Sequence, residues 1–151
     1  MSRAFVREND DAAEALPERP ISPHPNYVTP SGMARIEAET ARFAAEMRAA
    51  DGDREATARI GRDLRYWQAR RASAQLIPAP VDHAEVRFGS LVTLRDGAGQ
   101  ERTLRIVGED EADPGAGTLS YVAPLARSLI GRQVGDEAPM PGGLAEIIAI
   151  A

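Results

Sequence analysis

The sequence feature that most constrains the fold is a pair of heptad stripes on either side of an Asp-Gly-Asp turn signal at residues 51–53. In each stripe, mostly apolar residues recur at spacings of 3, 4, 3, 4 and 3, which is typical of a coiled-coil seam. The two stripes are Met33, Ile36, Thr40, Phe43, Met47 and Ala50, and then Thr57, Ile60, Leu64, Trp67, Arg71 and Ala74. The pattern predicts an antiparallel hairpin of two helices, each of about 20 residues and ~30 Å long.

The residues that flank the stripes set the limits of the hairpin. Thr29 supplies an N-cap hydroxyl, Pro30 suits the first helical position, and Pro78 ends the hairpin. The chain before it is rich in proline, which fixes φ and keeps the preceding residue extended. We expect that part to be a solvated leader, although its apolar pair Phe5-Val6 could dock on the protein or on a partner. The predicted parts are an extended Pro-rich tail (1–26), a helical hairpin (27–77) and a second domain (78–151).

The second domain changes to strand patterns. Runs of apolar and β-branched residues predict strands over 86–94, 103–107, 118–122 and 144–150, with Asp96-Gly97 as a hairpin turn. Residues 124–130 are predicted to form a short helix with Leu125, Leu129 and Ile130 facing inward, ended by Gly131. The predicted fold class is therefore α+β, a helical hairpin followed by a small domain built on a mostly antiparallel sheet.

Composition excludes several kinds of chemistry. The chain has no Cys, so thiol nucleophiles and thiolate metal sites are absent, and it has no Lys for a phosphate-binding loop. Its two histidines, His24 and His83, lack metal-ligand spacing, and no serine lies in a Gly-x-Ser-x-Gly setting. The acidic run 109–113 could hold a divalent cation, but a solvated loop is the favoured interpretation. A self-contained enzyme is poorly supported.

Charge and hydropathy bear on partners and location. The net charge of −5 disfavours binding to nucleic acid alone, although the hairpin is rich in Arg and could sit beside RNA or DNA within a complex. The N-terminal residues Met1 to Glu8 have no apolar core long enough for a signal peptide, and no stretch approaches the ~20 apolar residues of a membrane span. We therefore expect a soluble cytoplasmic protein.

Three acidic residues mark the apex of the predicted hairpin. Asp51, Asp53 and Glu55 lie where the protein itself cannot bury them. Carboxylates on a rigid arm could enter a cleft of another protein and help to hold a magnesium ion there. They also suit a turn and the positive N-terminus of a helix, which needs no functional role. Both interpretations remain open at this point.

Read as one piece, residues 27–150 resemble the bacterial Gre transcript-cleavage factors, GreA and GreB. The opening Tyr27-Val28-Thr29-Pro30-Ser31-Gly32 looks like that of the family, and Ala74-Gln75-Leu76-Ile77 looks like the end of its coiled coil. The strongest motifs lie further on: Phe88-Gly89, the stretch from Arg105 to Asp113, the stretch from Pro124 to Gly131, and Gly135-Asp136. Each motif alone is commonplace, but together they are specific.

The resemblance implies a function. The second domain would be an FKBP-like domain without isomerase activity that docks on RNA polymerase at the rim of its secondary channel, with Pro124, Ala126 and Arg127 as contact residues. The hairpin would enter the channel, where its tip acids help to bind the second catalytic Mg²⁺, so that the polymerase cleaves its own backtracked RNA. The resemblance implies an accessory factor rather than an enzyme, a monomer that binds no cofactor alone, shares the polymerase Mg²⁺ and contacts RNA or DNA only within the complex.

The tip departs from the family pattern. The family has Gly-Asp-x-x-Glu-Asn-Ala, and of these positions Gly52, Asp53 and Ala58 match. The Glu position is Ala56, while Glu55 comes one residue early. Each helix is also shorter by two to three turns, on the order of 10–15 Å of reach. A shorter arm occurs in the relative called the regulator of nucleoside diphosphate kinase, which binds polymerase without promoting cleavage.

Four candidate functions are weighed against the sequence. The first is stimulation of transcript cleavage, with Asp53 as the main carboxylate and Asp51 or Glu55 as the second. Another is a non-cleaving occupant of the channel that competes with other channel-binding regulators. An FKBP-type prolyl isomerase or chaperone needs a pocket lined by several aromatic residues, and the second domain has only Phe88 and Tyr121. A coiled-coil oligomerisation module is disfavoured by Thr40 and Arg71 in the seam.

Overall fold

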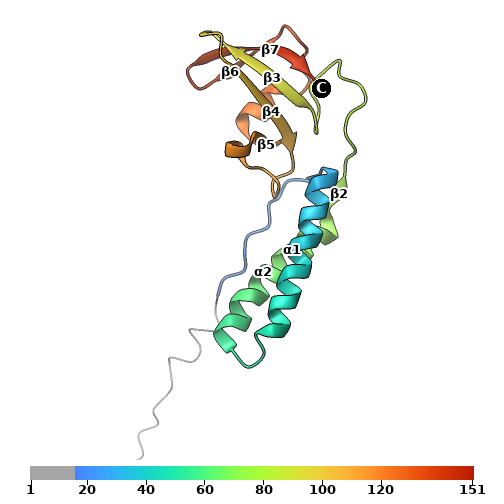
Figure 1. Ribbon diagram of the computed structural model, residues 1–151, viewed down its shortest axis with the longest axis vertical. Helices are drawn as coiled ribbons and strands as arrows, with labels where there is room; N and C mark the ends of the chain where they lie inside the picture. Colours follow the sequence, from blue (N-terminus) through green and yellow to red (C-terminus); the bar gives the residue numbers. More distant parts are fainter. Residues whose placement is uncertain (1–15) are drawn as a thin grey trace, which may run out of the picture. The chain divides into compact units, whose positions relative to one another are not determined.

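The computed structural model describes residues 16–151, so Phe5-Val6 lies outside the described residues. Two helices of 20 residues each, α1 (Pro30–Ala49) and α2 (Arg54–Ser73), fold back on one another through a tight turn (Figure 1). The turn uses Gly52 at a φ of 85°, in the left-handed region that favours glycine. The N-cap prediction is confirmed, because the backbone N–H of Gly32 donates to the Thr29 hydroxyl over 3.0 Å.

The seam between the helices is thinner than the sequence predicts. Ile36 and Trp67 are buried, and Met47 lies against Gly61, where an added Cβ would be 3.0 Å from the methionine Cε. The other large seam residues, Phe43, Met47, Ile60 and Leu64, are half-buried. The prediction for Arg71 is wrong, because this residue is exposed and Arg70 is buried instead. The last turn of α2 is therefore out of step with the 3,4 spacing of the stripe.

The chain before α1 is extended and mostly exposed, and it also contacts the hairpin. Residues 16–25 have no helix or strand, as the prolines predict. Residues 16–23 nevertheless belong to the same compact unit as Ile36–Ala72. Their contacts with α2 are described below. The described residues of this segment are mostly exposed, and its contacts with the hairpin come mainly from Glu18 and Arg19.

A short parallel pair joins the two ends of the hairpin. Strand β1 (Tyr27–Val28) precedes α1 and pairs with β2 (Gln75–Leu76), which follows α2. This pair belongs to the second compact unit, which comprises His24–Arg35 and Ser73–Ala151. The division of the chain thus differs from the predicted boundaries at 27 and 78, because the first turn of α1 is held by the sheet-containing unit.

The second unit is built on a five-stranded sheet in the order β5-β4-β3-β7-β6. Its strands are β3 (Leu91–Asp96), β4 (Glu101–Val107), β5 (Thr118–Ser120), β6 (Glu137–Met140) and β7 (Gly143–Ile150). The pairs β3–β4, β3–β7 and β6–β7 are antiparallel, as predicted, but β4 and β5 are parallel. The loop between β4 and β5, which contains the 3-10 helix η1 (Pro114–Ala116), brings the chain back to the same direction.

Two local predictions in this unit need correction. Residues 86–90 are not a strand, because Gly89 has a φ of 88° and the Ser90 hydroxyl accepts the N–H of Arg87 over 2.9 Å, which makes a turn. The acidic run 109–113 is not simply solvated, because Glu109, Asp110 and Glu111 are half-buried and Glu111 accepts a hydrogen bond from Thr29. Strand β6 was not predicted from the sequence.

Helix α3 (Pro124–Leu129) packs on the sheet and ends close to its predicted position. Leu129 is fully buried and Leu125 is partly buried against the core, but Ile130 is 41% exposed, so its predicted inward position is wrong. The core that they join is made of small aliphatic residues: Val86, Val92, Leu94, Leu104, Ile106, Ala126, Leu129, Ala138, Ala145 and Ile147. The α+β class is confirmed.

Candidate functional site

The tip of the hairpin carries the three predicted acidic residues, and all three are exposed. Asp51 lies in the turn, Asp53 immediately precedes α2 and Glu55 lies in its first turn. The Oδ1 atom of Asp53 accepts the backbone N–H of Ala56 over 3.0 Å. Asp53 is therefore the N-cap of α2, and the positive end of the helix dipole favours its charge and that of Glu55.

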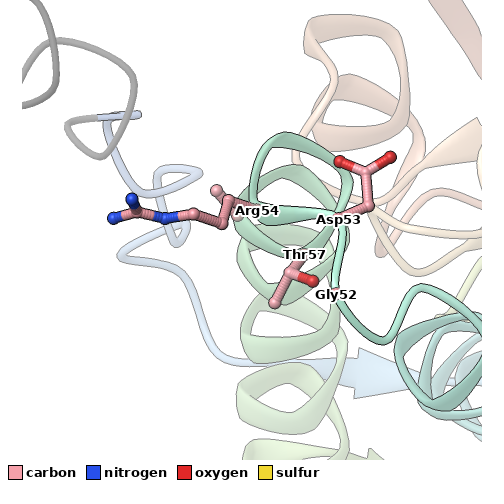
Figure 2. Close-up of a pocket in the computed structure, with 5 residues that line it drawn as sticks. Gly52, Asp53, Arg54 and Thr57 are labelled. Carbon is pink, nitrogen blue, oxygen red and sulfur yellow. The ribbon is translucent and has the colours of Figure 1, made fainter.

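The tip has a shallow hollow of about 320 Å³ next to these acids, lined by Gly52, Asp53, Arg54, Thr57 and Ala58. Figure 2 shows that the Asp53 carboxylate and the Arg54 guanidinium project to opposite sides of the tip. The Thr57 hydroxyl donates to the carbonyl oxygen of Ala50 over 3.3 Å, which ties the first turn of α2 to the end of α1. The cap therefore uses one oxygen of the Asp53 carboxylate, while the side chain as a whole stays exposed.

The tip acids do not form a ready-made metal site. Within residues 16–151, no group of three or more His, Asp or Glu side chains lies close enough to hold a metal ion. Asp51, Asp53 and Glu55 share the apex, but their carboxylates are not brought together. Carboxylate oxygens are ligands that Mg²⁺ prefers, so the tip can contribute one or two ligands to an ion that is held mainly by another protein.

The predicted docking residues on α3 separate into two groups. Pro124 and Arg127 are exposed, whereas Ala126 is fully buried in the core. The expected role of Ala126 in contacting a partner needs correction, because its side chain packs against the sheet. Beside Arg127, a hollow of about 390 Å³ is lined by His24, Tyr121, Val122, Arg127 and Ile130. The sequence analysis missed His24, Tyr121 and Ile130 here, because they come from separate segments and form no motif.

Three aromatic side chains meet on the second unit. The ring centroids of Tyr27 and Tyr121 are 5.4 Å apart, those of Phe88 and Tyr121 are 5.7 Å apart, and those of Tyr27 and Phe88 are 6.0 Å apart. The Tyr121 hydroxyl donates to the carbonyl oxygen of Pro25. The rings pack against one another, and Tyr121 and Phe88 line separate hollows, so the three rings do not together line one aromatic pocket of the kind a prolyl isomerase needs.

The described part of the chain, residues 16–151, has no helix that is both long and apolar enough to cross a membrane. The sheet-containing unit matches a family model described as "Transcription elongation factor, GreA/GreB, C-term" over residues 81–151. This match and the two-helix arm point to a transcription elongation factor, and the relatives described next place the whole chain in that class, as an accessory protein rather than an enzyme.

Similarity over most of the chain identifies the family. The transcription elongation factor GreB of Xanthomonas axonopodis pv. citri (strain 306) is 34% identical over 148 residues, which cover 82% of this chain and 88% of that protein. GreB of Neisseria meningitidis (serogroup A, strain Z2491) is 32% identical over 146 residues, with 81% and 90% covered. A crystal structure of Thermus thermophilus GreA factor homolog 1 aligns with a TM-score of 0.42 at 20% identity. The alignment covers 85% of this chain and 99% of that chain. The chain belongs to the GreA/GreB family of transcription elongation factors.

Proposed function

We propose that this protein docks on bacterial RNA polymerase at the secondary channel and stimulates the cleavage of backtracked RNA by the polymerase itself. The observation that carries the proposal is the set of exposed carboxylates at the apex of a two-helix arm. Asp53 is the main candidate, because its N-cap bond orients the carboxylate through Oδ1 while the side chain stays exposed. We also propose that the protein acts as a monomer in the cytoplasm, where RNA polymerase works.

The chemistry would be shared between the two proteins. A polymerase-held Mg²⁺ supplies the activation of a water molecule and the stabilisation of charge on the cleaved phosphate. Asp53 would contribute a carboxylate oxygen to that ion, and Asp51 or Glu55 would supply a second. The role of the helices is to hold these acids at the end of a rigid arm, each helix being ~30 Å long at 20 residues.

The exposed face of α3 is the proposed contact with polymerase. Pro124 and Arg127 are exposed on this helix, and Arg127 lines a hollow together with His24 and Tyr121. An exposed guanidinium next to a partly apolar hollow suits a partner surface that combines an acidic residue with an apolar one. Ala126 has no part in this proposal, because it is buried.

The cleavage proposal is tested with purified RNA polymerase halted in a backtracked state. Addition of the protein should shorten the RNA, and Asp53→Asn should abolish the shortening while the protein still binds. Glu37→Gln is a matched control, because Glu37 is an exposed acid on α1 far along the sequence from the tip. Cleavage that survives Asp51→Asn/Asp53→Asn/Glu55→Gln would remove the tip from the mechanism.

The docking proposal is tested by binding. Pro124→Asp and Arg127→Glu should each weaken binding to polymerase without unfolding the protein, because both side chains are exposed. Arg102→Glu makes the same charge change on an exposed residue of β4 and should leave the affinity unchanged. Equal affinities for all of these variants would contradict the assignment of α3.

A second candidate function is occupation of the channel without cleavage. It is favoured by the position of Glu55, which lies one residue before the family's Glu position and so about 100° around the helix from it. In that case the wild type and Asp53→Asn should both bind polymerase, should both leave the RNA uncut, and should both displace other channel-binding factors.

A further inference from the structure

The extended segment before β1 is held against α2 by a two-pronged ion pair. The Nε atom of Arg65 donates to one carboxylate oxygen of Glu18 over 2.9 Å, and its Nη2 donates to the other over 2.6 Å. The two residues are 47 positions apart in the sequence. A fork-to-fork arrangement of this kind fixes orientation as well as distance, which a single-point contact does not.

The neighbouring residue, Arg19, makes a second contact with the same helix. Its Nη1 donates to Oδ1 of Asp63 over 3.2 Å. Its guanidinium lies 3.8 Å from the centroid of the Tyr66 ring and 5.8 Å from that of Trp67. Arg19 is therefore stacked on the aromatic residues of α2 and ion-paired to it at the same time, and its side chain is only partly exposed.

The prolines favour this docked conformation before any contact forms. Pro17 and Pro20 flank the two contact residues, and Pro23 follows. Arg19 directly precedes Pro20, which restricts Arg19 to an extended backbone. Such a segment loses less conformational entropy on docking than a flexible one, so modest contacts are enough to hold it.

The hairpin has a structural need for a third element. Of the 20 residues of α2, only Gly61, Trp67 and Arg70 are buried. Leu64 on α2 and Phe43 on α1 are only half-buried. Two helices with so thin a seam have little apolar burial of their own to keep them together, because most helical stability in proteins comes from packing.

We propose that residues 16–23 form a strap that clamps α2 through its polar and cation–π contacts and adds a third chain to the arm, with Glu18 and Arg19 as positioning residues (Figure 1). The clamp itself does not depend on the proposed function. Its consequence rests on that function: a stiffer arm holds Asp53, the residue that caps α2, in a narrower range of positions. Loss of the strap should therefore lower the rate of cleavage more than the affinity for polymerase.

The clamp is tested in the free, full-length protein. Trp67 is the only tryptophan, so the intrinsic emission reports on the face of α2 that Arg19 covers. Arg19→Ala should move the emission to longer wavelength and speed amide exchange in α2 by about three- to tenfold. Arg42→Ala is the matched control, because Arg42 also stacks on a ring and pairs with two acids, but all within α1. An emission and exchange pattern that Arg19→Ala leaves unchanged would overturn the strap.

A charge exchange separates the clamp from a general effect of mutation. Glu18→Arg should release the strap as Arg19→Ala does, because it places two guanidinium groups together. The double variant Glu18→Arg/Arg65→Glu restores an opposite pair with the same reach and should recover the emission and exchange of the wild type. A double variant that is no better than Glu18→Arg would show that the pair does not hold the segment.

The consequence for function is tested on backtracked polymerase. Arg19→Ala should lower the maximal rate of RNA cleavage severalfold while the concentration for half-maximal effect changes little. A change in that concentration alone would overturn the positioning role. If the wild type does not stimulate cleavage at all, the proposed function fails, and the strap is judged by the emission and exchange measurements.

Discussion

The hydroxyl of Thr29 links the start of α1 to Glu111, which lies in the acidic loop after β4. The same oxygen accepts the N–H of Gly32 over 3.0 Å and donates its proton to the Glu111 carboxylate. The first turn of α1 contains no acidic residue of its own. Glu111 therefore supplies, from 82 residues away, the negative charge that a helix N-terminus favours.

Removal of this hydroxyl should destabilise the protein. Thr29→Ala should cost about 1 kcal/mol, within a range of about 0.5–2, because Gly32 loses its capping acceptor. Thr29→Ser keeps the oxygen and should stay close to the wild type. Urea denaturation followed by circular dichroism measures both. A Thr29→Ala protein as stable as Thr29→Ser would contradict the capping role.

A glycine beside β1 has no room for a side chain. A Cβ atom at Gly108 would lie 2.3 Å from the carbonyl oxygen of Tyr27, which is backbone and cannot rotate away. Gly108→Ala should therefore destabilise the protein by about 1–3 kcal/mol, as overpacking does. Gly97→Ala is the control, because nothing lies within 4 Å of its Cβ position and its φ is ordinary. Similar denaturation midpoints for the two variants would show that β1 can move aside.

Two substitutions of Asp53 separate its structural role from its proposed chemical role. Asparagine caps a helix as well as aspartate does, so Asp53→Asn should leave stability within a few tenths of a kcal/mol while cleavage is lost. Asp53→Ala removes the acceptor of the Ala56 N–H and should cost about 1 kcal/mol in addition to cleavage. Thermal denaturation and the cleavage assay are measured on the same preparations. Full cleavage activity in Asp53→Asn would show that Asp53 serves only as the cap of α2.

Trp67 is the largest buried side chain contributed by α2, with an exposed fraction of 7%. Trp67→Ala should lower the free energy of unfolding by about 3–5 kcal/mol, because it leaves a cavity under a thin seam. Gln68→Ala changes the next residue, which is exposed, and should stay within about 0.5 kcal/mol of the wild type. A loss below about 1 kcal/mol for Trp67→Ala would mean that the arm repacks around the missing ring.

The strap should weaken in acid. The hydrogen bond from Arg65 lowers the pKa of Glu18 below its ordinary value of 4.5, with smaller contributions from the charges of Arg65 and Arg62. The folded protein therefore favours the ionised carboxylate, so the clamp is complete above pH 4.5 and is lost as the pH falls through the lowered pKa. The emission of Trp67 should shift to longer wavelength over this range. Glu18→Gln removes the titrating carboxylate, and an identical pH profile for this variant would contradict the role of Glu18.

The hairpin could be predicted because its signals are local. Thr29, Pro30 and the turn at 51–53 act through neighbouring residues, and the structure has the cap, the turn and two helices of the predicted length. Burial of Arg70 in place of Arg71 could not be read from apolar spacing, because a guanidinium is buried only where the fold supplies its partners.

The strap and the exposed face of α3 could not be predicted from the sequence, for a different reason. Glu18 and Arg65 form no motif, because 47 residues separate them and an isolated charge has no preferred partner in a sequence. His24 and Arg127 likewise meet beside one hollow from distant segments. The acids of the tip were predicted in place because a turn gathers them from adjacent positions, whereas the burial of Ala126 depends on how a one-and-a-half-turn helix lands on the sheet.

The parallel pairing of β1 with β2 has a consequence for how such arms change in length. The N–H of Gln75 donates to the carbonyl of Asn26 over 2.8 Å, and that of Ile77 donates to Val28 over 2.9 Å, so the chain enters and leaves the arm at neighbouring points. Turns added in matched pairs beside the tip would leave these bonds untouched. A hairpin lengthened by matched turns beside the tip, with Thr29 and its hydrogen bond to Glu111 kept, should therefore fold without redesign of the unit that carries it.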